Sequence, residues 1–319
     1  MTAPLHPLHP LHSRHPRLRA ALAAAALTAG VALAPLLGSC LPGDTRPTPG
    51  VLDFTVEPSE AVTAGVTTED GWTITFERLL VGIGGASVNG AACNNYSGNR
   101  YDRLIEATVP GPQKLATVYG LGTCALRFRV RTPSQSALLG EQVSADDLAF
   151  MKLQGSDAHV PSGGTSVYAQ GHATREGVTK RFAWQFRLGY SFHDCGSDAG
   201  PPPEDADSDA GDSVTIEIHG GDAQAMPLRV FGEELFRAGI AEDAGLRFGP
   251  LAEADTDGDE EITLEELAKL PSPEPAEDAG ATDAGPPTLA DFVYQTRIPR
   301  MIWLEGLGRC RADVRPTNL

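Results

Sequence analysis

The sequence predicts a mainly β fold with a small α-helical subdomain, and three observations lead to this prediction. Aromatic residues make up only 6% of the 319 residues, whereas Gly (35) and Pro (25) are plentiful, as in chains with many turns. Between residues 51 and 219, apolar and polar residues alternate along several segments. After residue 220, the spacing of the apolar residues changes to that of short helices.

The alternating segments are the predicted strands. Each has an apolar residue at every second position, which is the periodicity of a strand that is buried on one face. The clearest of them are 72–76 (WTITF), 124–131 (CALRFRVR), 182–188 (FAWQFRL) and 214–218 (VTIEI). Turns rich in Gly, Ser and Asn separate these segments, and this pattern favours an antiparallel β-sandwich-like domain over residues 51–219.

Four segments are predicted to be helical. They are 144–153 inside the β region, and 232–240, 263–270 and 288–306 in a helical subdomain that spans residues 220–319. Three of them begin with the spacing of a capping box, in which a Ser or Thr N-cap is followed three residues later by an acid. The pairs are Ser144 with Asp147, Thr263 with Glu266, and Thr288 with Asp291. Pro299 is expected to kink or end the last helix.

The first 39 residues have the pattern of an export signal. A positively charged start, with three arginines and no acid, precedes an apolar run over residues 20–38. Leu37, Gly38 and Ser39 then precede Cys40, and this stretch resembles the lipobox of bacterial lipoproteins. The resemblance implies cleavage before Cys40, acylation of this cysteine and a lipid anchor in a membrane. Leu41 favours the outer membrane or a periplasm-facing position in the sorting logic of that family.

The remaining four cysteines predict disulfides. An even number of cysteines in an exported chain indicates pairing, and three connectivities are open. We favour Cys93–Cys124 and Cys195–Cys310, because each pair would close one region of the chain. No CxxC occurs in the sequence, which disfavours a cysteine-rich metal site.

Composition also predicts unstructured segments and limits the partners. Residues 40–50 are expected to form a tether, and 196–212 and 272–287, rich in Pro, Gly, Asp and Ala, to be disordered loops or linkers. The formal net charge is −17, with 42 acidic and 25 basic residues. This charge excludes nucleic acid as an expected partner and favours cations.

The segment 255–266, DTDGDEEITLEE, has the clearest functional pattern. Calcium takes six to eight oxygen ligands, which a twelve-residue loop supplies from positions 1, 3, 5, 7, 9 and 12. The residues at these positions are Asp255, Asp257, Asp259, Glu261 (through its carbonyl), Thr263 and Glu266. With apolar Ile262 at position 8 and helical sequence on both sides, the segment resembles the EF-hand motif over about 25 residues. The resemblance implies Ca²⁺ as the cofactor.

Glu260 departs from this motif. It occupies position 6, where the family has glycine because the chain turns with a positive φ. A non-glycine residue in that conformation costs on the order of 1–2 kcal/mol, so a weak site suited to calcium-rich surroundings is expected. No second loop with this pattern occurs in the sequence, which indicates a structural or weakly regulatory calcium rather than a sensor.

Two other functions stay open. One is a cell-surface module that binds carbohydrate or protein through its loops. The other is a periplasmic copper- or zinc-binding protein, in which His172 and His193, near strand ends, would meet in space. The sequence has no GxSxG, HExxH or paired-carboxylate pattern, so no enzymatic function is expected.

Overall fold

The structure, a computed structural model, describes residues 47–97, 101–156, 162–195, 215–241, 243–273 and 287–316. The export-signal segment, Cys40, most of the predicted tether, the acidic segment 196–212 and most of 272–287 lie outside the described residues. The chain divides into two units at Pro47, and the fold below is that of the second unit, Thr48–Leu319.

Strands dominate this unit, as the sequence predicts. Two of them are long, β3 (Thr73–Asn89) and β6 (Gln113–Val130). Four are of intermediate length: β1 (Gly50–Pro58), β8 (Val167–Arg175), β9 (Val178–Phe186) and β12 (Ala223–Val230). The short strands are β2 (Val66–Thr67), β4 (Cys93–Asn95), β5 (Asp102–Glu106), β7 (Leu138–Leu139), β10 (Leu188–His193), β11 (Ile216–Ile218), β13 (Glu261–Ile262), β14 (Ile302–Leu304), β15 (Gly308–Arg309) and β16 (Arg311–Pro316).

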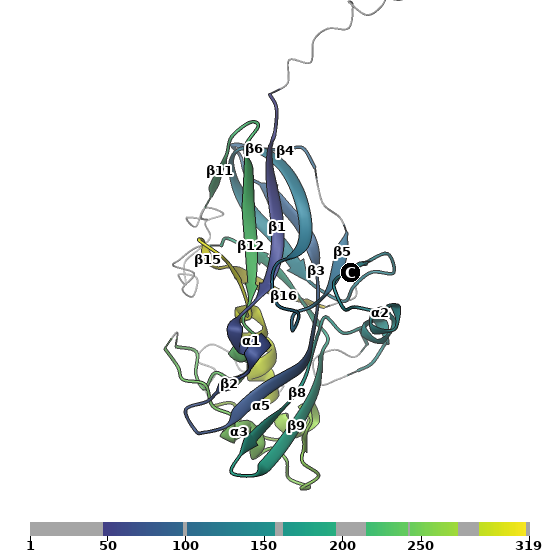
Figure 1. Ribbon diagram of the computed structural model, residues 1–319, viewed down its shortest axis with the longest axis vertical. Coiled ribbons are helices and arrows are strands. Elements are labelled where there is room, and N and C mark those ends of the chain that lie inside the picture. Colours follow the sequence, from purple (N-terminus) through teal and green to yellow (C-terminus); the bar gives the residue numbers. More distant parts are fainter. Residues whose placement is uncertain are drawn as a thin grey trace, which may run out of the picture. The chain divides into compact units, whose positions relative to one another are not determined.

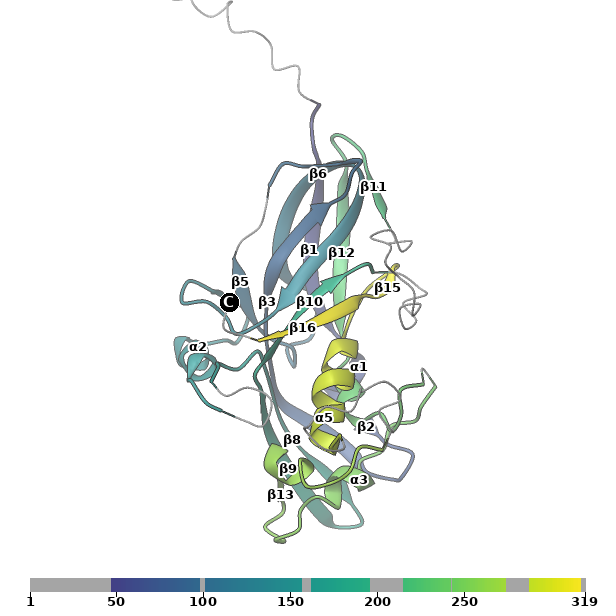
Figure 2. The same ribbon diagram turned by 180° about the vertical axis from the view of Figure 1, so that it is seen from behind.

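The strands of the described part form one mixed sheet. Its sixteen strands share one hydrogen-bonded network, whose main path runs β13-β9-β8-β3-β6-β1-β12-β14-β15. Most neighbours are antiparallel, whereas β1–β12, β5–β7 and β13–β9 are parallel. Figures 1 and 2 show the sheet curling as β3 and β6 run along it. A register shift in β3 between Gly84 and Ser87 marks an irregularity of the kind that bends a strand.

The mainly β prediction is therefore confirmed, but its finer form is not what the structure shows. A sandwich requires two separate sheets that pack face to face. Here β6 pairs with β1, β3, β4, β10 and β11, so the strands on either side of it belong to one continuous network. Strands as long as β3 and β6 can follow a curled sheet from end to end, which the local alternation of residues does not reveal.

Strand β9 shows how the alternating pattern builds the core. Phe182, Trp184 and Phe186 are buried, whereas Ala183 between them is exposed. Burial of side chains of this size stabilises the fold by about 1.5–3 kcal/mol each. The Phe182 ring centroid lies 4.8 Å from that of Trp184 and 5.5 Å from that of Phe236. One core thus contains residues from both predicted regions, and the proposed boundary near residue 220 stays a prediction.

The helices are shorter than the sequence suggests. They are α1 (Glu60–Ala64), α2 (Ala145–Lys152), α3 (Gly249–Ala252), α4 (Leu264–Leu267) and α5 (Leu289–Phe292). All three predicted capping boxes are present, at the starts of α2, α4 and α5. Within the described residues, none of the helices has the length and apolar character that crossing a membrane requires.

Two segments that the sequence predicts to be α-helical adopt other types of helix. The segment from Gly232 forms a 3-10 helix, η2 (Gly232–Phe236), without a side-chain cap. After α5 the chain continues as a π-helix, η3 (Val293–Arg297), and then a 3-10 helix, η4 (Ile298–Arg300), which contains Pro299. The α-helix thus ends well before Pro299, which lies in the last helical turn of this segment, and Trp303 beyond it lies in β14.

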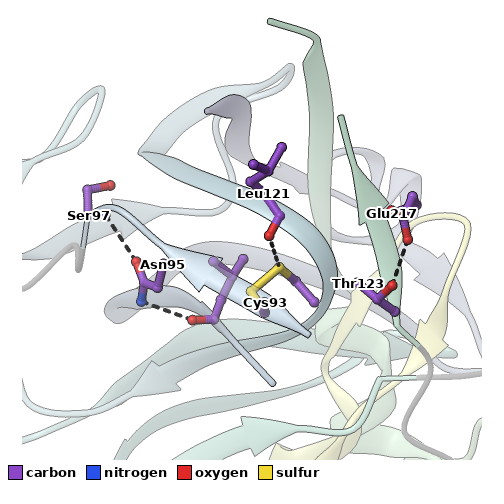
Figure 3. Close-up of a disulfide and its surroundings, with 8 residues drawn as sticks. Cys93, Asn95, Ser97, Leu121, Thr123 and Glu217 are labelled. Atoms are coloured by element: carbon purple, nitrogen blue, oxygen red, sulfur yellow. Dashed lines mark hydrogen bonds between the residues drawn. A yellow bond between two sulfur atoms is a disulfide. The ribbon is translucent and has the colours of Figure 1, made fainter. Parts of the chain in front are cut away.

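Both favoured disulfides are confirmed. Cys93 in β4 is bonded to Cys124 in β6, and Cys195, just after β10, is bonded to Cys310. Figure 3 shows the first of them beside a hydrogen bond that Thr123 of β6 donates to Glu217 of β11 at 2.7 Å. The second disulfide joins segments that are 115 residues apart and so ties the end of the chain to the sheet.

The two disulfides are expected to differ in their effect on stability. In the chain-entropy description, a cross-link over 115 residues contributes about 4.8 kcal/mol and one over 31 residues about 3.7 kcal/mol. Replacing Cys195 and Cys310 together by serine should therefore lower the free energy of unfolding more than replacing Cys93 and Cys124. Urea unfolding of both variants measures the difference. The reverse order would show that loop length does not govern their contribution.

Candidate metal centre

The predicted calcium loop lies between α3 and α4 along the chain. Figure 2 shows its strand β13 beside β9. Helix α3 ends at Ala252, and α4 begins at Leu264 with Thr263 as its N-cap. Between them, Glu261 and Ile262 form β13, which pairs in parallel with β9. The backbone of the loop is therefore paired with the main sheet at these two residues.

Ile262 anchors the loop in the core, as its position predicts. Its side chain is completely buried in the main hydrophobic cluster. The indole Nε1 of Trp184 donates a hydrogen bond of 2.7 Å to the carbonyl oxygen of Ile262. Two residues before Ile262, the carbonyl oxygen of Glu260 accepts a hydrogen bond of 2.8 Å from the amide of Arg181. Both bonds connect β9 to the loop, so the position of the loop depends on this strand.

Asp255, Asp257 and Asp259 form the acid trio of the loop. Each offers one carboxylate oxygen, and the three oxygens lie within 4.8 Å of one another. Calcium–oxygen distances are about 2.3–2.6 Å, so two ligands on opposite sides of one ion are separated by roughly 4.6–5.2 Å. The spread of the trio therefore fits within the coordination sphere of a single calcium ion.

The trio also shapes the loop through backbone hydrogen bonds. Asp255 Oδ1 accepts from the amide of Gly258 at 2.8 Å, and Asp257 Oδ1 accepts from the amide of Asp259 at 3.2 Å. Asp259 Oδ1 accepts from the amide of Glu261 at 2.8 Å. Such Asx turns fold the chain tightly around the carboxylates.

Glu260 adopts the conformation that position 6 requires. Its φ is +67°, in the left-handed region that favours glycine, and Gly258 two residues earlier has a φ of +78°. The turn directs the amide of Glu260 to Asp255 Oδ2, with a hydrogen bond of 3.1 Å. The sequence-based expectation of a strained residue at this position is confirmed.

The remaining predicted ligands lie outside the trio. Glu266 is buried, and its Oε2 accepts hydrogen bonds from the amide of Thr263 at 2.9 Å and from its hydroxyl at 3.0 Å. This carboxylate therefore caps α4. The side chain of Glu261 is exposed and belongs to β13. Of the six residues that the sequence proposes, the structure gathers three side chains, and Glu266 would have to turn from the cap to join them.

Lys180 of β9 is the residue that sequence reasoning missed. Its ammonium group contacts Asp255 Oδ2 and forms an ion pair with it. Because of this hydrogen bond and the positive charge, the pKa of Asp255 is lowered. The side chain of Asp255 is wholly inaccessible to solvent, whereas that of Lys180 is 17% exposed. The two residues are 75 positions apart, and only the pairing of β13 with β9 brings them together.

The two histidines of the transition-metal alternative have separate partners. His172 Nδ1 lies 3.0 Å from Glu77 Oε1. His193 Nδ1 lies 2.6 Å from Asp194 Oδ2, and its Nε2 lies 3.3 Å from Asp313 Oδ1. Among the described residues, the acid trio is the cluster of three or more such side chains close enough to share a metal ion, and neither histidine belongs to it.

Compared with protein families, with curated proteins and with solved structures, the chain matches none.

Replacing Glu260 by glycine is expected to stabilise the metal-free fold. Relief of the left-handed conformation is worth about 1–2 kcal/mol, and the added freedom of the unfolded chain offsets about 0.5–1 kcal/mol of it. Urea unfolding should show a net gain of about 0.5–1 kcal/mol. Glu265→Gly, in the first turn of α4, is the matched control and should lose stability. A loss in Glu260→Gly would mean that the glutamate side chain contributes a contact that outweighs the strain.

Proposed function

We propose that the protein binds one calcium ion in the loop 255–266. The acid trio carries the proposal, because three carboxylate oxygens within 4.8 Å of one another suit one hard divalent cation. In this assignment Asp255, Asp257 and Asp259 supply these oxygens. The carbonyl of Glu261, Thr263 (directly or through a water) and the carboxylate of Glu266 complete the ligand set.

The proposed role of the ion is structural. The loop packs on the core through Ile262 and is paired with β9, so an ion that holds the loop also holds the end of the sheet. A ligand that binds the folded state alone raises the free energy of unfolding with its concentration. Glu260 in a left-handed conformation supports a weak site, of the kind that extracellular calcium saturates at Kd values of about 10⁻⁴–10⁻³ M.

We further propose that the protein is an exported lipoprotein anchored through Cys40. The sequence around this cysteine carries this part of the proposal. Two disulfides are compatible with an oxidising compartment outside the cytosol. Such a location would expose the loop to calcium-rich surroundings, and a weak site is useful there.

Calcium titration by calorimetry should give binding heat in the wild type and none in Asp257→Ala. Asp257 is exposed, so its replacement removes a ligand without disturbing the core. The matched control is Asp146→Ala, which removes an equal exposed charge from α2 and should leave the binding unchanged. Equal heats in Asp257→Ala and the wild type would rule out this loop as the site.

Thermal unfolding with calcium separates a structural ion from a switch. At a free calcium concentration of 100 times Kd, the free energy of unfolding should rise by about 2.7 kcal/mol. We expect this rise without a change in the radius of gyration measured by X-ray scattering. A large compaction on calcium addition would instead identify a conformational switch.

The anchor is tested in a bacterial host that processes lipoproteins. The wild type should incorporate labelled palmitate and sediment with membranes, because acylated Cys40 buries its chains in the bilayer. Cys40→Ala should remain unlabelled. Labelling that persists in Cys40→Ala would refute acylation at this position.

A further inference from the structure

We propose that Lys180 is a built-in counter-ion that calcium has to displace, and that it sets the calcium affinity of the loop. The inference rests on the proposed function of this loop. Lys180 lies outside the loop, on the neighbouring strand β9. For the metal to enter, the ammonium group of Lys180 leaves Asp255 and a calcium ion takes its place.

The contacts of Asp255 require this exchange. Its Oδ2 accepts hydrogen bonds from Lys180 and from the amide of Glu260, and its Oδ1 accepts from the amide of Gly258. Solvent does not reach the side chain of Asp255. A calcium ion bound to this carboxylate would lie within a few ångströms of the ammonium group, where two positive charges repel strongly. Lys180 must therefore move before Asp255 can act as the first ligand of the loop.

The backbone of Lys180 cannot move away, but its side chain can. Lys180 precedes Arg181, which is paired with Glu261 of β13, and shares the inward face of β9 with Phe182. The strand therefore holds its Cα atom beside the loop in both states. Its long, flexible stem lets the ammonium group swing without a rearrangement of the sheet.

A destination for the displaced ammonium group lies next to the loop. Lys180 also lines an open groove of about 380 Å³ between the β8–β9 hairpin and α3. Two carboxylates, Glu176 and Glu253, line the same groove, as does the guanidinium group of Arg175, which lies over the ring of Trp72. The released charge can thus pair with other acids and stay solvated, so the exchange does not bury an unpaired charge.

The ion pair between Lys180 and Asp255 explains how an acidic loop can be folded without metal. Three aspartates crowded within 4.8 Å repel one another, and the ammonium group of Lys180 neutralises part of that charge. The same contact makes calcium compete with an intramolecular cation for Asp255. Lys180 therefore favours a preformed loop at the expense of calcium affinity.

The matched pair Lys180→Met and Lys180→Arg tests this competition. Methionine keeps a flexible stem of similar length and removes the charge, whereas arginine keeps the charge. Calorimetric titration should give Lys180→Met roughly ten-fold tighter calcium binding than the wild type, with Lys180→Arg within about two-fold of it. Lys114→Met, in which an exposed lysine is replaced in the same way, controls for the change in net charge and should stay close to the wild type.

The outcomes separate this inference from the proposed function. If neither the wild type nor Lys180→Met binds calcium, the proposed function fails, and this inference fails with it. If the wild type binds and Lys180→Met binds equally or more weakly, the inference alone is overturned. Calcium binding by both proteins, with the tighter binding in Lys180→Met, supports both.

A labelling experiment on the wild type keeps the test independent of mutant stability. Lysine acylation followed by mass spectrometry reports the accessibility of each amine. Lys180 should react slowly without calcium and at least about three-fold faster with saturating calcium, because its partner Asp255 then binds the metal. Lys114, with 63% of its side chain exposed, should react at the same rate in both conditions. An unchanged rate at Lys180 under saturating calcium would overturn the displacement.

Discussion

The parallel pairing of β13 with β9 is the contact on which the candidate metal centre depends. It is only two residues long, Glu261 and Ile262 opposite Arg181 and Phe182. It is reinforced from within the core, because the indole of Trp184 donates to the carbonyl of Ile262. This short ladder holds the second half of the loop against the sheet, and the aspartates accept hydrogen bonds from amides of the loop itself.

The same pairing places the loop next to the side chains of β9. Strand β9 contributes aromatic rings to the core and, on the same inward face, the ammonium group of Lys180 to Asp255. One carboxylate of the loop, that of Asp255, is therefore paired with a cation of the protein itself. In the proposed exchange, a calcium ion would replace this ammonium group at Asp255, which would favour a small structural change over the large opening of a calcium sensor.

Local signals explain which parts of the fold could be predicted from sequence. The three capping boxes were predictable because each depends on two residues three positions apart, such as Thr263 and Glu266. The buried faces of β6 and β9 followed from alternation, and the left-handed Glu260 from its place in the loop. Lys180 could not be predicted, because its contact with Asp255 depends on the pairing of segments 75 residues apart. The single curled sheet was missed for the same reason. The alternation of apolar and polar residues determines which face of a strand is buried, but not which strand it pairs with.

Backbone amide spectra recorded by NMR during a calcium titration test the central claim most directly. Calcium bound to the loop should shift the signals of Gly258, Glu260 and Lys180 together, with one midpoint, because these three residues contact Asp255. Signals of β4, beside the Cys93–Cys124 disulfide, should stay in place. Loop signals that do not move at millimolar calcium, or that move with a different midpoint from Lys180, would contradict a calcium site built on β13 and β9.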